Sequence, residues 1–90
     1  MMKNFEDHWH EMETHFDFEM VYKTMKLLDW TWGQNEEASI PSVKRIKARA
    51  EEICRSAYEK EMQIESAGFS AHYEKDSLHL CFIVDSWETS

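Results

Sequence analysis

Hydrophobic residues recur every three or four positions over three segments, and this spacing predicts three α-helices. The longest helix is expected over about 42–63. One of its faces carries an apolar stripe: Val43, Ile46, Ala50, Ile53, Cys54, Ala57 and Tyr58. Pro41 suits the start of this helix, where a missing N–H costs nothing, and Ser39 or Ser42 can cap the free amides. We expect the rest of the chain to pack against it.

Two shorter helices are predicted earlier in the chain. The first covers about 4–14 and has few apolar anchors: Phe5, Trp9 (or His8 in its place) and Met12. The second covers about 18–29, and Asp17 suits its N-cap position. Its apolar stripe is wider: Phe18, Val21, Tyr22, Met25 and Leu28. This width indicates burial on more than one side.

Period-two alternation near the end of the chain predicts a β-hairpin with strands at about 69–74 and 77–84. If Lys75 and Asp76 form the loop, one face carries three apolar cross-strand pairs: Tyr73 with Leu78, Ala71 with Leu80, and Phe69 with Phe82. The other face then pairs His72 with His79 and Ser70 with Cys81. The Trp-Thr-Trp pattern also allows a short strand at 30–32.

These elements predict an α+β fold, with three helices packed on a small antiparallel sheet. Ninety residues make one compact domain over 1–90, with frayed ends. A core of this size is marginal, and 13% of the residues are aromatic. We therefore expect some aromatic rings to lie at a subunit interface, in a homo-oligomer.

The net charge of −8 is distributed unevenly along the chain. Residues 1–40 have nine acids and three bases and residues 61–90 six acids and one base, whereas residues 41–60 have three acids and six bases. Such an acidic chain is not expected to bind nucleic acid directly, because that requires cations over a wide face. A local pocket for an anion remains possible.

Four cations crowd the start of the longest helix, where the helix dipole favours acids: Lys44, Arg45, Lys47 and Arg49. Two interpretations stay open. The cations can form an anion site with the free amides of the helix start, or they can pair with Glu36, Glu37 and other acids of the chain. In the first case Lys44, Arg45 and Lys47 would meet phosphate, and Trp32 would stack on a base.

Other candidate sites are less specific. In the predicted register His72, His79 and Cys81 share one face of the hairpin and are weak candidates for metal ligands, although histidines on an open sheet face are usually solvated. The chain has no GxSxG motif and only two glycines, which leaves no Gly-rich phosphate loop. We therefore expect no enzymatic activity and no cofactor.

Cellular location follows from cysteine use and hydropathy. The two cysteines lack zinc or redox spacing, so a reducing cytosol is favoured over a disulfide framework. No apolar run is long enough to span a membrane, and the first residues lack the apolar core of an export signal.

A pattern covering most of the chain resembles small hypothetical proteins of tailed bacteriophages and prophages. The pattern comprises Phe16-Asp17-Phe18, Val21, Met25, Leu28, Trp30-Thr31-Trp32, Pro41 opening a helix, Ser66-Ala67-Gly68-Phe69 and the strand Leu78 to Val84. The resemblance implies a small accessory protein in the cytoplasm of an infected bacterium. It supplies no catalytic residues.

Together these features predict a non-enzymatic accessory protein that binds a host component. Our leading hypothesis is a host-defence inhibitor that sequesters a small anionic signal, such as a nucleotide. The alternative is an acidic protein inhibitor, or a nucleic-acid mimic, that acts on a host enzyme through its N-terminal acids: Glu6, Asp7, Glu11, Glu13, Asp17 and Glu19. Those acids can equally form a solvated surface that keeps the protein soluble.

Overall fold

The computed structural model describes residues 4–29, 41–66 and 68–83. Within them it has three helices followed by three strands: α1 (Phe5–His15), α2 (Phe18–Leu27), α3 (Val43–Lys60), β1 (Gln63–Ser66), β2 (Phe69–Glu74) and β3 (Ser77–Phe82). The predicted α+β class is correct. The additional strand predicted at 30–32 lies outside the described residues.

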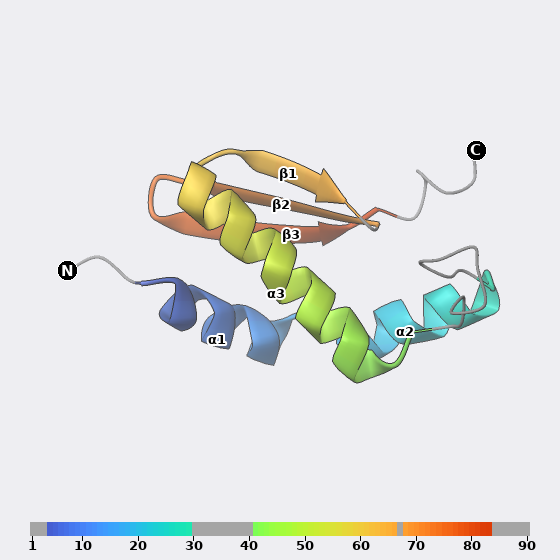
Figure 1. The fold of residues 1–90 in the computed structure, drawn as a ribbon. Coiled ribbons are helices and arrows are strands. Elements are labelled where there is room, and N and C mark those ends of the chain that lie inside the picture. Colours follow the sequence, from blue (N-terminus) through green and yellow to red (C-terminus); the bar gives the residue numbers. More distant parts are fainter. Residues whose placement is uncertain (1–3, 30–40, 67, 84–90) are drawn as a thin grey trace.

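The sheet is an antiparallel meander in the order β1-β2-β3, and α3 crosses one of its faces diagonally (Figure 1). Helix α1 packs against α3 and against β3, and α2 packs against the first half of α3. The start of α3 therefore lies beside α2, whereas its end lies close to the β2–β3 turn. No helix in the described ranges is both long and apolar enough to cross a bilayer.

Each helix begins at a side chain that caps its first turn. Asn4 Oδ1 accepts from the backbone N–H of Asp7 at 2.9 Å, and Asp17 Oδ1 accepts from that of Met20 at 3.0 Å. Ser42 Oγ accepts from the N–H of Arg45 at 3.2 Å. The prediction of Asp17 as a cap is confirmed, and Ser42 is the observed cap of α3; Ser39 lies outside the described residues.

The end of α3 differs from the prediction. The helix stops at Lys60 instead of residue 63, and Glu61 adopts a left-handed conformation with φ of 51° while its N–H bonds to the carbonyl of Ala57. The next residues form β1, which pairs with β2 through Ile64 opposite Ala71. Helical spacing alone missed this change because no glycine marks the helix end. As a strand, these residues form backbone hydrogen bonds with β2. They could not form those bonds if they continued the helix.

The β2–β3 pairing has the predicted register, and β1 extends it to a three-stranded sheet. Tyr73 lies opposite Leu78, Ala71 opposite Leu80, and Phe69 opposite Phe82. Lys75 and Asp76, with φ of 53° and 61°, form the connection. Positive φ at both loop residues is what a tight two-residue hairpin turn requires. Strand β3 ends at Phe82, before the predicted end at residue 84.

The core lies between the inner face of the sheet and the three helices. Phe69 and Ala71 on β2 are fully buried, as are Ile46 and Cys54 on α3. Helices α1 and α2 close the core from the side with Phe5, Trp9, Phe18, Val21 and Met25. The outer face of the sheet is polar. The apolar residues of β2 therefore lie on the inner face, where α3 packs against them.

Candidate functional site

The basic start of α3 is partly exposed. Its first turn contains no acid, and both Lys44 and Arg45 are exposed, whereas Lys47 and Arg49 are half-buried. The observed helix therefore places Lys44, Arg45 and Lys47 within its first two turns, where the sequence predicted them. Trp32, the predicted stacking residue, lies outside the described part of the chain.

Two of these cations lie close to carboxylates of the same chain. Lys47 Nζ is 3.8 Å from Glu13 Oε2 on α1 and 5.9 Å from the centre of the Phe18 ring. Arg49 Nη1 is 3.6 Å from Glu52 Oε1, one turn along α3. Arg45 also interacts with another group of the protein. Ion pairs within the chain therefore account for part of the basic cluster. Exposed ion pairs contribute little free energy, so an anionic ligand can displace the carboxylates from these cations.

A hollow of about 160 Å³ lies along this helix face, lined by Arg45, Ala48, Arg49 and Glu52. A water molecule takes about 30 Å³ in the liquid, so the hollow has room for roughly five waters. The hollow is open to solvent and has room for a phosphate group between Arg45 and Arg49, with Glu52 at its edge. A nucleotide bound here would leave its sugar and base outside this hollow.

The weak metal candidates do not form a ligand set. His72 does lie opposite His79, and Cys81 follows on β3. His72 Nε2 is instead 3.3 Å from Glu74 Oε1 on its own strand. Within the described ranges, no three histidine, cysteine or acidic side chains are arranged to hold a metal ion.

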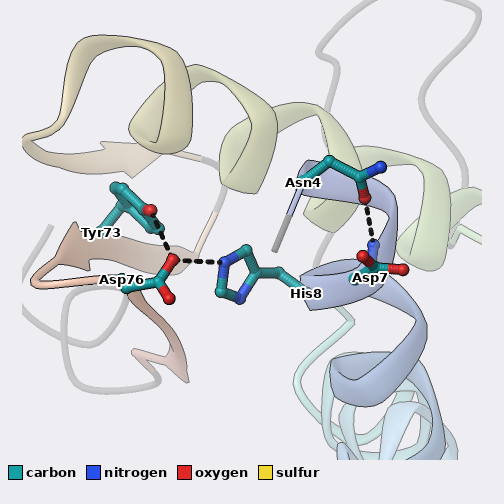
Figure 2. A network of polar contacts seen from close by, with 5 residues as sticks. All are labelled: Asn4, Asp7, His8, Tyr73 and Asp76. Carbon is teal, nitrogen blue, oxygen red and sulfur yellow. Dashed lines mark hydrogen bonds and ion pairs between the residues drawn. The ribbon is translucent and has the colours of Figure 1, made fainter. Parts of the chain in front are cut away.

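A second cluster, not predicted from the sequence, joins α1 to the β2–β3 turn around His8. The side chain of His8 is only 5% exposed. Its Nε2 lies 3.6 Å from Asp76 Oδ1 and has no hydrogen-bond partner. Asp76 Oδ1 also accepts a hydrogen bond from the Tyr73 hydroxyl at 3.1 Å (Figure 2).

Aromatic rings enclose the other sides of His8. Its ring meets Tyr73 edge-to-face at 5.5 Å and lies 5.9 Å from Tyr58. Burial raises the pKa of Tyr73 above its ordinary value, and the hydrogen bond to Asp76 raises it further. Tyr73 therefore stays protonated at neutral pH and remains the donor to the Asp76 carboxylate.

An open cavity of about 270 Å³ lies beside this cluster. Four of its lining residues come from α1, one from the β2–β3 turn and two from the start of β3: His8, Glu11, Met12, His15, Asp76, Ser77 and Leu78. His8, Glu11 and His15 are spaced by three and four residues, which places them on one stripe of α1. Only one feature of the sequence pointed to this cluster: His8 can take the place of Trp9 on the apolar face of the first helix.

Comparison with protein-family models, curated proteins and solved structures finds no match for this chain. The expected relation to small phage proteins therefore stays a prediction.

Proposed function

We propose that the protein is a non-enzymatic binding protein that sequesters a small anionic ligand at the start of α3. The observation that carries this proposal is the pair of exposed cations, Lys44 and Arg45, on a helix whose first turn has no acid. Helix starts present N–H groups without helical partners and the positive end of the dipole. Cations added at that point favour a phosphate group.

The contacts around the site support a modest affinity. Lys47 and Arg49 lie near Glu13 and Glu52, so a phosphate has to compete with carboxylates for these two cations. The chain as a whole is strongly acidic, which repels anions at long range. Lys44 and Arg45 are the exposed members of the cluster, so a phosphate reaches them most directly. Added salt weakens contacts of this exposed kind.

A nucleotide signal is the ligand class that agrees best with the sequence. Two of the four residues that line the hollow, Arg45 and Arg49, are cations that can meet a phosphate group, and a base would lie outside it. The resemblance to small phage proteins suggests a setting: defence signalling in an infected bacterium, where capturing such a signal would protect the phage. In a homo-oligomer, cations of a second copy could add to the same site.

Removing two cations tests the proposal. We expect titration calorimetry to detect binding of a cyclic di- or trinucleotide, and Lys44→Ala with Arg45→Ala to weaken it by about tenfold or more. A charged hydrogen bond contributes about 1.5–3 kcal/mol, and about 1.4 kcal/mol corresponds to tenfold in affinity. The matched control is Lys60→Ala with Lys75→Ala. It removes the same charge at the opposite end of α3 and should change affinity less than threefold.

Two results would contradict the proposal. One is that none of the tested cyclic nucleotides binds. The other is that both double variants weaken binding equally, because the ligand would then respond only to net charge.

The alternative function is inhibition of a basic protein by the acidic surface of α1. It is favoured by the exposure of Glu6, Asp7 and Glu11, on a helix that buries Phe5 and Trp9 on its other side. Several acids of α1 have internal partners, however, and Glu11 is one of them. Glu13 lies near Lys47, and Glu6 lies 3.7 Å from Arg55 Nη2.

This alternative predicts capture of a basic bacterial protein in a pulldown. Capture should be lost on combined substitution of Glu6, Asp7, Glu11 and Glu13 by their amides, and it should weaken in high salt. Capture that survives both changes would remove α1 as the binding surface.

A further inference from the structure

Strand β1 forms an edge of the sheet that no other described strand covers. It pairs with β2 alone, and all of its residues except Ile64 are exposed (Figure 1). The opposite edge strand, β3, differs because α1 packs against it. Proteins commonly protect a free edge with a lysine, a proline or a bulge. Strand β1 contains neither lysine nor proline, and its register with β2 is continuous, so its edge is open to another strand.

The register of the hairpin determines which backbone groups of β2 face β1. A two-residue loop closes on a hydrogen-bonded pair, here Glu74 with Ser77, and bonded pairs alternate with non-bonded ones along an antiparallel ladder. The bond from the Ile83 N–H to the Gly68 carbonyl at 2.7 Å continues this alternation. The residues of β2 between the bonded ones, Ala71 among them, therefore direct their N–H and C=O groups toward β1.

The same alternation gives the directions of the backbone groups on β1. Ile64 lies opposite Ala71 and bonds to it within the sheet. Gln63 and Glu65 lie on either side of Ile64, so each directs one N–H and one C=O away from the sheet. These outward donors and acceptors form the pattern that an added antiparallel strand requires.

We propose that this edge binds an extended, basic segment of a partner protein, which joins the sheet as a further antiparallel strand. In this mode of recognition, backbone hydrogen bonds supply affinity and side chains supply specificity. Three exposed acids, Glu59, Glu61 and Glu65, lie in or just before β1, and Lys60 is the only base among residues 59–66. Lysine or arginine in the partner complements these acids. A second copy of the chain would instead bring the same acids together, and like charges oppose that pairing.

A cavity of about 270 Å³ lies at the start of this edge. Its lining residues are Tyr58, Glu59, Glu61 and Tyr73. On β2, Tyr73 follows His72, the partner of Gln63, so the cavity lies just beyond the first pair of the β1–β2 ladder. A long basic side chain of the added strand can extend into it and meet the carboxylates of Glu59 and Glu61.

The two faces of β1 limit the sequence of the partner further. Ile64 packs against the core on the inner face, whereas Gln63 and Glu65 have their side chains on the outer face. Partner residues opposite Gln63 and Glu65 share that outer face and direct their N–H groups toward β1. We therefore expect basic residues at those positions and apolar residues between them, beside Ile64.

The experiment is an NMR titration of isotope-labelled protein with the peptide acetyl-Lys-Val-Arg-Val-Lys-Val-amide. We expect saturable shifts along β1 and slower hydrogen exchange of the Gln63 and Glu65 amides, whereas the Ile64 amide is already bonded within the sheet. N-methylation of the basic residues of the peptide removes the donors that face β1 and should weaken binding by about tenfold. N-methylation of the valines keeps those donors and the same charge. It should change the affinity less than threefold.

Substitution of the acids tests the charge requirement separately. Glu59→Gln with Glu61→Gln should weaken binding of the unmodified peptide by about threefold or more, because exposed ion pairs each contribute little. The matched control is Glu19→Gln with Asp29→Asn, which removes the same charge from exposed positions on and just after α2. It should change the affinity less than twofold.

The proposal is overturned if the unmodified peptide gives no saturable shifts, or if its shifts centre on β3 or α1. It is also overturned if both methylated peptides bind equally well, because binding would then depend on charge alone. Shifts of β1 that grow with protein concentration in the absence of peptide would assign the edge to a second copy of the chain instead. None of these outcomes involves the cations at the start of α3, so the proposed function is tested separately.

Discussion

Replacing Phe69 by alanine is expected to lower the free energy of unfolding by about 3–5 kcal/mol. Phe69 is fully buried on the central strand β2, and it contacts Phe16 and Phe82 with ring centres 6.3 and 5.7 Å away. Alanine would leave a cavity under α3 that the sheet cannot close. Domains of this kind are stable by only about 5–15 kcal/mol, so the loss is large. Urea unfolding followed by circular dichroism measures it.

Phe82→Ala is the matched control for this prediction. The change is chemically identical and affects the cross-strand neighbour of Phe69, which is only half-buried on β3. We expect a clearly smaller loss in the free energy of unfolding, because the half-buried Phe82 ring buries less apolar surface than the Phe69 ring does. An equal loss in both variants would show that the core is not centred on β2.

The second large effect is a loss of stability at alkaline pH. Cys54 is fully buried on α3; burial raises the pKa of its thiol from 9.0 to about 12, and the nearby Glu51 charge adds to the rise. Below about pH 9 both the folded and the unfolded protein keep this proton, and stability is unaffected. Between pH 9 and 12 only the folded protein keeps it. The free energy of unfolding therefore falls by about 1.4 kcal/mol per pH unit.

The measurement compares urea unfolding of the natural chain and of Cys54→Ala at pH 8 and pH 10. We expect the natural chain to lose about 1.4 kcal/mol more than the variant over this interval. The pKa of Tyr73 is also raised, which destabilises the protein in the same direction at higher pH, but this contribution is common to both proteins. Equal losses in the two proteins would contradict a buried, protonated Cys54.

Local signals in the sequence predicted much of the fold. Asp17 was predicted as a cap from its residue type and position, and the pairing of β2 with β3 from period-two alternation and a two-residue loop. Strand β1 was missed, because residues 61–63 are compatible with helix and their conformation depends on pairing with β2. Such pairing between separate segments cannot be derived from helical periodicity.

The two sites differ in how much the sequence revealed. The cations at the start of α3 were evident because they break a local rule of helix chemistry. That Glu13 lies beside Lys47 was not predictable, because the contact requires α1 to pack against α3. The contact between His8 and Asp76 needs both that packing and the position of the hairpin turn. Neither residue stands out from its neighbours in the sequence.

The most direct test of the proposed anion site is to map a bound cyclic nucleotide onto the backbone amides by NMR. The proposed function predicts saturable shifts confined to the first two turns of α3, centred on Lys44 and Arg45. Shifts centred elsewhere, or absent from those two amides while the ligand binds, would contradict it.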